Sequence, residues 1–276
     1  MIPLARNLVG RTAIVTGSSS GNGRAIAFAL AKAGANVVCS DRRAEQPPEG
    51  YEEDHQPTHL AIQSKYRAKS IYHQCDVQHQ SQIRSLVRCA VGEFGRLDIM
   101  VNNAGIFTGL KTILDCSEEE YDATMAVNAK GTYLGCKYAI EQFLSQAPCA
   151  ASAGGESHSI GKIINIASMG GIIGLMQEPA YCASKGAVVN LTRQLAIDFG
   201  KKGVNVNAVC PGFMATAMVR PFLEDPGLKR FLDESTPWPV LGTAEDVANA
   251  TIWLASPGSD FMTGSILTID GGFTAR

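Results

Sequence analysis

Short apolar runs alternate with helix-like segments along most of this chain, and that alternation restricts the fold more than any other feature. Strands are predicted where apolar runs end in turn residues, at 11–17, 36–40, 71–77, 97–101, 163–166, 204–210 and 265–269. Helices are predicted where apolar side chains recur at helical spacing, at 24–32, 58–67, 80–94, 117–144, 181–199 and 244–255. Strands that alternate with helices form parallel sheets covered on both faces, so we expect a doubly wound α/β fold.

No internal repeat, coiled coil or linker interrupts this pattern, so we expect one domain over residues 1–276. The 276 residues can bury a full core, and a hydrophobic content of 45% is ordinary for a globular protein. The net charge of −2 provides no basic surface for nucleic acid. Apolar runs are too short to span a membrane, and the N-terminus lacks the apolar core of a signal peptide. We therefore expect a cytoplasmic protein without nucleic-acid or membrane partners.

The 8 cysteines form no C-x-x-C motif, and no pair of histidines has the spacing of metal ligands. Cys39, Cys136 and Cys210 lie inside apolar runs, where free cysteine behaves as a small hydrophobic residue. We therefore expect reduced thiols and no structural metal.

A glycine-rich turn joins the first predicted strand to the first predicted helix. Its pattern is G-x-x-x-G-x-G, and it contains Gly17, Ser19, Gly21, Asn22 and Gly23. Backbone N–H groups and the helix dipole both attract an anion at such a turn, which predicts a phosphate site. The spacing differs from the commoner G-x-G-x-x-G fingerprint, so a tight turn formed only for packing is the alternative explanation.

Asp41 ends the second strand at the distance from the glycine turn where dinucleotide-binding folds place an acidic residue. Such a carboxylate binds the adenosine ribose hydroxyls and disfavours a 2′-phosphate. Arg42 and Arg43 follow directly, and their guanidinium groups could accept that phosphate. We expect NAD as the cofactor, with NADP as the alternative.

Residues of the same kind follow the next two strands. Asp76 and Val77 end the third strand, and the sequence Asn-Asn-Ala-Gly at 102–105 follows the fourth. Ligands of parallel sheets bind beyond the carboxyl ends of the strands. These residues, the glycine turn and Asp41 should therefore converge on one site.

Tyr181 and Lys185 are four residues apart on one predicted helix, so their side chains should meet on one face. Tyrosine has a pKa of about 10 and is a poor base near neutrality. A nearby ammonium favours the phenolate, so we expect Lys185 to lower the pKa of Tyr181 towards the working pH. Ser168, at the end of the preceding strand, could bond the same substrate oxygen. The alternative is an exposed tyrosine and a solvated lysine.

Two further regions carry expectations about the site. Asn128 lies inside the helical region 117–144, where an asparagine is usually solvated, and nearby Gly131 suggests a local irregularity with a freed carbonyl. Residues 213–238 mix apolar side chains with prolines and show no steady period, which suits a mobile lid over an apolar pocket. The polar segments 44–70 and 146–161 have no predicted chemistry.

With these motifs in hand, the chain resembles the short-chain dehydrogenase/reductase family from about residue 9 to 272. The matching motifs are T-G-x-x-x-G-x-G at 16–23, C-D-V at 75–77, N-N-A-G at 102–105, Asn128, Ser168, Y-x-x-x-K at 181–185, P-G-x-x-x-T at 211–216 and D-G-G at 270–272. The resemblance implies a seven-stranded Rossmann fold and hydride transfer between nicotinamide and a carbinol or carbonyl carbon.

The resemblance also implies a role for each matching residue. Tyr181 would be the general acid/base, Ser168 would orient the substrate oxygen, Lys185 would bind the ribose and lower the tyrosine pKa, and Asn128 would anchor a water in a proton relay. The cofactor would be bound by Gly17, Ser19, Gly21, Asn22, Gly23, Asp41, Arg42, Asp76, Val77, Asn103, Ala104, Gly105, Tyr181, Lys185, Pro211, Gly212 and Thr216. Position 22 departs from the family, which usually has an aliphatic residue there.

These motifs predict an NAD(P)-dependent enzyme that interconverts a secondary alcohol and a ketone. The small-molecule substrate would be bulky and weakly polar, and the protein would be a homotetramer or homodimer, as family members commonly are. The alternatives are a reductase acting on C=N, C=C or sugar substrates, and a non-catalytic dinucleotide-binding protein.

Overall fold

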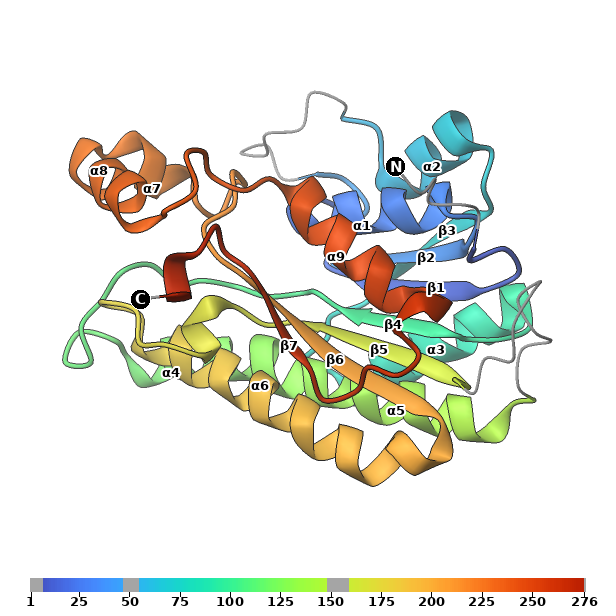
Figure 1. Cartoon of the computed structure of the whole chain (residues 1–276). Coiled ribbons are helices and arrows are strands. Elements are labelled where there is room, and N and C mark those ends of the chain that lie inside the picture. The colour runs from blue at the N-terminus through green and yellow to red at the C-terminus, as the bar shows by residue number, and fades with distance from the viewer. Residues whose placement is uncertain (1–6, 47–54, 148–158, 276) are drawn as a thin grey trace.

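A single parallel sheet organises the chain in the computed structural model, which describes residues 7–46, 55–147 and 159–275. Its seven strands lie in the order β3-β2-β1-β4-β5-β6-β7 (Figure 1). The strands are β1 (Thr12–Thr16), β2 (Asn36–Asp41), β3 (Ser70–Gln74), β4 (Ile99–Asn102), β5 (Gly161–Ile166), β6 (Val204–Pro211) and β7 (Ile266–Ile269). Each adjacent pair is parallel. The predicted doubly wound, seven-stranded α/β fold is therefore confirmed.

Helices cover both faces of the sheet (Figure 1). One face carries α1 (Gly21–Lys32), α2 (Thr58–Tyr66) and α9 (Ala244–Ala255). The other carries α3 (Gln80–Phe94), α4 (Glu118–Thr124), α5 (Thr132–Ser145) and α6 (Pro179–Phe199). No helix within the described ranges combines the length and apolarity needed to cross a bilayer.

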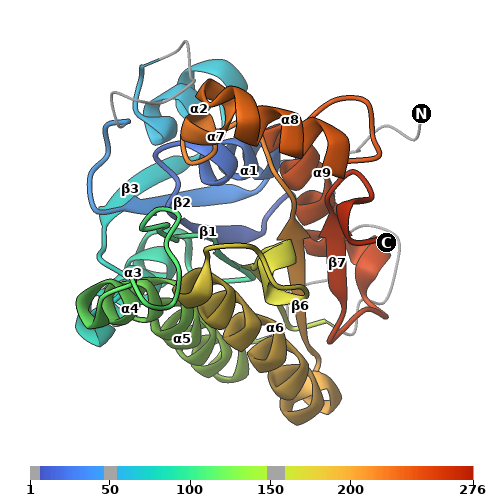
Figure 2. The same ribbon diagram turned by 90° about the vertical axis from the view of Figure 1, so that its left-hand side faces the viewer.

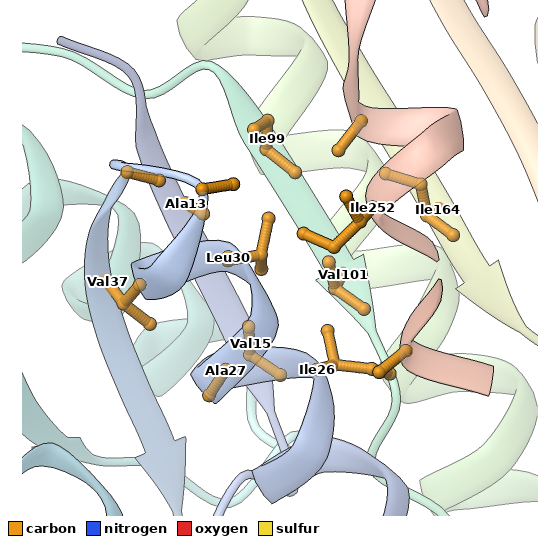
Figure 3. Packing of buried hydrophobic residues seen from close by; sticks show 14 of the residues in the cluster. Ala13, Val15, Ile26, Ala27, Leu30, Val37, Ile99, Val101, Ile164 and Ile252 are labelled. Carbon is orange, nitrogen blue, oxygen red and sulfur yellow. The ribbon is translucent and has the colours of Figure 1, made fainter. Parts of the chain in front are cut away.

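The strands contribute alternate side chains to two separate cores because successive residues of a strand point to opposite faces. Ala13 and Val15 pack with α1 and α9, whereas Ile14 packs with α3 and α5. Figure 3 shows the first of these cores, where Leu30 and Ile252 meet the strands. Burial on both faces explains why the strands are continuous apolar runs rather than alternating ones.

The helical region predicted at 117–144 is divided by a π-helix. Ser117 caps α4 through a capping box with Glu120, and residues Met125–Gly131 then form the π-turns before α5. A side chain on Gly131 would lie 2.7 Å from Val77, so glycine permits the close approach of this segment to the end of β3. The local irregularity expected near Gly131 is present.

Residues 213–238 differ from the expected irregular lid, because they contain α7 (Arg220–Glu224) and α8 (Pro226–Ser235). Asp225 starts α8, and its carboxylate accepts hydrogen bonds from the N–H groups of Gly227 and Leu228. Pro226 occupies the first helical position, which proline favours. The Asp-Pro pair at the start of α8 predicts this helix. A search for a steady helical period of apolar residues misses it.

Two glycines in helices should respond oppositely to the same substitution. A Cβ at Gly135 of α5 would collide with Asn102, whose amide is fixed by a 2.9 Å hydrogen bond to Asn165, whereas Gly92 of α3 faces open space. We expect Gly135→Ala to lower the free energy of unfolding by about 1–3 kcal/mol. Gly92→Ala should raise it by about 1 kcal/mol, since alanine favours the helix.

Urea unfolding of the two variants and the parent protein measures both changes. A Gly135→Ala protein as stable as the parent would show that the packing between α5 and β4 is looser than described.

Candidate active site

A cavity of about 370 Å³ opens at the carboxyl edge of the sheet, where the strand order reverses between β1 and β4. Figure 2 looks onto this edge, with α7 and α8 on one side and α4 and α6 on the other. The cavity is lined by all the residues predicted to bind a cofactor: Gly17, Ser19, Gly21, Asn22, Gly23, Asp41, Arg42, Asp76, Val77, Asn103, Ala104, Gly105, Tyr181, Lys185, Pro211, Gly212 and Thr216. Ser168 also lines it, whereas Asn128 does not.

The turn between β1 and α1 brings backbone groups to one end of this cavity. Gly17 has a φ of 65°, and a Cβ on it would lie 2.8 Å from Ala104. Ser20, which precedes α1, makes no side-chain cap, and the first turn of α1 contains no acidic residue. The positive end of the helix dipole therefore faces the cavity without a carboxylate of its own, as an anion site requires.

The loop after β4 is hydrogen-bonded to this glycine turn. The Thr16 hydroxyl accepts hydrogen bonds of 3.0 and 3.1 Å from the N–H groups of Asn103 and Ala104. The Asn103 amide donates in return to the carbonyl oxygens of Thr16 and Gly17, at 2.9 and 3.0 Å. These bonds hold the floor of the cavity at a fixed distance from the turn.

Asp41 lies at the end of β2, beside the glycine turn. Its carboxylate accepts a 3.1 Å hydrogen bond from the Ser19 N–H and a 2.8 Å bond from the Arg42 N–H. The Ser19 hydroxyl donates to the Arg43 carbonyl at 2.6 Å. The acidic group is thus fixed by backbone donors, while the Arg42 and Arg43 side chains are exposed.

The residues after β3 and β6 complete the walls. Asp76 accepts a 3.0 Å hydrogen bond from the Gln78 N–H, which fixes the turn that carries Val77. On the opposite side, Gly212 approaches Asp270 so closely that a Cβ would lie 2.8 Å from its Cα. Thr216 faces Gly21, since a Cβ on Gly21 would lie 3.8 Å from the Thr216 methyl group.

Tyr181 and Lys185 meet on one face of α6, as their spacing predicts. The Lys185 Nζ lies 5.7 Å from the centre of the Tyr181 ring and donates a 2.9 Å hydrogen bond to the Ile166 carbonyl. Ser168 follows β5, and its hydroxyl accepts a 3.0 Å hydrogen bond from the Gly170 N–H. Tyr181 is only half-buried, so its phenol is reachable from the cavity, whereas Lys185 is almost fully buried.

The expected fall in the pKa of Tyr181 is wrong for this structure. Desolvation raises the pKa of Tyr181 above its ordinary value, a hydrogen bond with Ser168 opposes the rise, and the charge of Glu178 adds to it. Burial also lowers the pKa of Lys185 to about 8, because the ammonium forms no ion pair with a described residue. Desolvation is the largest cause of both pKa shifts, and a four-residue spacing in the sequence does not reveal it.

Asn128 is fully buried, in contrast to the usual solvated asparagine within a helix. Its amide oxygen accepts a 2.8 Å hydrogen bond from the Ile106 N–H. Its amide nitrogen donates to the Ile106 carbonyl at 3.0 Å and to the Ser184 hydroxyl at 3.1 Å. Asn128 of the π-helix thus connects the loop after β4 to helix α6. Its contact on α6 is Ser184, the residue before Lys185.

Aromatic side chains form the outer wall of the cavity. Phe107 packs edge-on against Tyr181 with ring centres 5.7 Å apart, and Phe222 of α7 follows at 5.9 Å. Phe213 lies 5.7 Å beyond Phe222, and it packs against Phe273 at 5.8 Å. Sequence reasoning missed Phe107 because no periodic pattern marks the loop that carries it.

Glu178 is another lining residue that sequence reasoning missed. It lies three residues before Tyr181, a spacing that places two side chains on the same side of a helix start. Only 7% of its surface is exposed, and burial raises the pKa of its carboxyl group to about 7.

The residues present fit a dinucleotide in three respects. An uncapped helix N-terminus suits a pyrophosphate, the carboxylate of Asp41 suits ribose hydroxyls, and the glycines at 17 and 23 keep the turn close to the floor of the cavity. Within the described residues, no group of three or more histidine, cysteine or acidic side chains could bind a metal ion.

Comparison with known proteins gives consistent relatives. The family model described as enoyl-(acyl carrier protein) reductase matches residues 17–274. A 2,5-dichloro-2,5-cyclohexadiene-1,4-diol dehydrogenase from Sphingobium indicum is 34% identical over 270 residues, which are 98% of this chain and 99% of that protein.

Solved structures agree in fold over the whole chain. A short-chain type dehydrogenase/reductase from Mycobacterium marinum is 32% identical with a TM-score of 0.85, and 98% of each chain is covered. A protein from Agrobacterium tumefaciens, assigned as a 2-deoxy-D-gluconate 3-dehydrogenase and solved with NADP, is 33% identical with a TM-score of 0.83 over 100% of both chains. The chain belongs to the short-chain dehydrogenase/reductase family.

Proposed function

We propose that this protein is an NAD(P)-dependent oxidoreductase that interconverts a secondary alcohol and a ketone. The observation that carries the proposal is that Ser168, Tyr181 and Lys185 line the same cavity as the glycine turn and Asp41. The dehydrogenases among its relatives support the reaction class. A non-catalytic binding protein is disfavoured because both Tyr181 and Lys185 are present and accessible from that cavity.

A nicotinamide cofactor bound in this cavity would supply or receive the hydride, and the protein's own side chains control the proton. Tyr181 removes the hydroxyl proton of the alcohol during oxidation and returns it to the carbonyl oxygen during reduction. Ser168, which is hydrogen-bonded to Tyr181, orients the same substrate oxygen. Lys185 binds the ribose hydroxyls, and Asn128 anchors a proton-relay water.

The cofactor would lie across the sheet edge. Gly17, Ser19, Gly21, Asn22 and Gly23 would contact the pyrophosphate, and Asp41 with Arg42 the adenosine ribose. Asp76 and Val77 would border the adenine. The remaining cofactor contacts would come from Asn103, Ala104, Gly105, Pro211, Gly212 and Thr216. The NADP reported for the Agrobacterium protein leaves NADP as the alternative to NAD.

The small-molecule substrate would be bulky and weakly polar, because Phe107, Phe222 and Met169 line the same cavity as Tyr181. Residues 213–238 would act as a lid, since Phe213 and Phe222 reach this wall. We further propose a homotetramer or homodimer built on the helices at 117–144 and 181–199. Exposed apolar side chains there, Tyr121, Tyr133, Leu144 and Ile197, support such an interface.

A cytoplasmic location is also part of the proposal. Cys39, Cys75, Cys136 and Cys210 are buried free thiols, which are typical of proteins from reducing compartments.

The role of Tyr181 is tested by Tyr181→Phe, which removes the hydroxyl and keeps the ring against Phe107. We expect kcat for alcohol oxidation to fall by about 10²–10⁴-fold, the usual contribution of general acid/base catalysis. Binding of NAD(H), measured by fluorescence titration, should change little. A variant that retains near-normal turnover would reject this role for Tyr181.

The pKa directions predict the dependence on pH. Oxidation needs the phenolate, and the raised pKa of Tyr181 keeps the phenol protonated at neutrality. The kcat/KM for oxidation should therefore rise from pH 7 to pH 10, because the fraction of phenolate grows over that range. Carbonyl reduction, which needs the phenol, should stay nearly constant up to about pH 9. Steady-state rates in both directions measure this, and an oxidation rate that falls between pH 7 and pH 9 would contradict it.

Cofactor preference is tested at Asp41. Its fixed carboxylate would repel a 2′-phosphate, so kcat/KM should be higher with NAD(H) than with NADP(H). Asp41→Ser removes that charge next to Arg42 and Arg43, and the preference should shrink by about tenfold or reverse. Glu93 is exposed on α3, and Glu93→Gln is the matched charge-loss control. A parent enzyme that prefers NADP(H) would show that the arginines decide the choice.

A further inference from the structure

Glu178 is a buried carboxylate in the substrate part of the cavity, and neither cofactor binding nor proton transfer uses it. It lines the cavity beside Tyr181 and is 7% exposed. No described residue donates a hydrogen bond to its carboxylate or forms an ion pair with it. A buried charge without a partner is costly, so this position requires an explanation.

The backbone explains how Glu178 comes to face the cavity. Glu178 directly precedes α6, where an acidic side chain commonly accepts a hydrogen bond from the first helical turn, yet it makes no such cap. Gln177, immediately before it, has a φ of 62°, a left-handed conformation that is unfavourable for a residue with a side chain. The Gln177 carbonyl accepts a 2.8 Å hydrogen bond from the Lys111 N–H, which holds this turn in place.

The surroundings of the carboxylate define what it can bind. Met169, Leu175 and Phe107 are among the apolar residues that line this cavity with Tyr181. Burial raises the pKa of Glu178 to about 7, because no cation compensates its charge. A second carboxylate would be repelled there, whereas a hydroxyl group could donate a hydrogen bond to it.

We propose that Glu178 is a specificity-determining residue that accepts a hydrogen bond from a second hydroxyl group of the substrate, on an apolar skeleton whose first hydroxyl reacts at Tyr181. The substrate class is therefore a neutral, cyclic or branched diol and its hydroxyketone product. This inference rests on the proposed oxidoreductase function and narrows its substrate.

The experiment compares cyclohexane-1,2-, 1,3- and 1,4-diol with 4-methoxycyclohexanol, which has similar bulk and only one hydroxyl. For the parent enzyme, kcat/KM for the best diol should exceed that for the methoxy compound by roughly ten- to hundredfold, as a hydrogen bond to a charged group provides. Glu178→Leu should reduce this ratio to about one, and the isosteric Glu178→Gln should retain part of it. Glu93→Leu, at an exposed position of α3, should leave the ratio unchanged.

Binding of the cofactor by fluorescence titration shows whether each variant is folded, and the isosteric glutamine variant guards against a misfolded leucine variant. A ratio that stays within twofold of the parent value in both Glu178 variants would overturn the assignment, as would a parent enzyme without any diol preference. If the parent oxidised none of these alcohols, the proposed reaction would fail. Calorimetric titration of the diols would then still decide the role of Glu178, since a tenfold loss of affinity in Glu178→Leu supports it and unchanged affinity contradicts it.

Discussion

The hydrogen bonds between Thr16 and the Asn103–Ala104 segment connect the two strands between which the order of the sheet reverses. β1 and β4 are paired as far as Val15 and Val101, but the chain leaves them towards opposite faces, so the segments that follow the strands would otherwise diverge. Because the threonine hydroxyl accepts from two backbone donors, the glycine turn and the cavity floor keep one relative position. The shape of the cofactor end of the cavity depends on this connection.

A second connection fixes the reacting end. Asn128 uses both atoms of its amide group, binding the loop after β4 on one side and Ser184 on the other. The π-helix brings this side chain into a fully buried position beside Lys185. The amide thus aligns α6 with the floor, and a change in its packing would displace the tyrosine and lysine together rather than one of them.

Much of the fold and of the cofactor end could be predicted from the sequence, because local patterns determine them. Apolar runs marked the strands, the glycine spacing marked the turn before α1, and four-residue spacing placed Tyr181 and Lys185 on one face. Two properties that depend on long-range packing, the pKa of Tyr181 and the orientation of Glu178, could not be predicted. Desolvation raises the pKa of Tyr181 because distant segments enclose it. The orientation of Glu178 depends on the left-handed backbone of Gln177 and its bond to Lys111, which no short motif encodes.

The row of rings from Phe107 through Phe222 and Phe213 to Phe273 has a consequence for how this enzyme could diversify. Phe273 is remote from Tyr181 along the chain and does not line the cavity, yet it supports the rings that do. Substitutions in the last turn of the described chain can therefore reshape the space offered to a substrate while the proton-transfer groups stay untouched. Selection on that short turn would offer evolution a way to alter selectivity separately from chemistry.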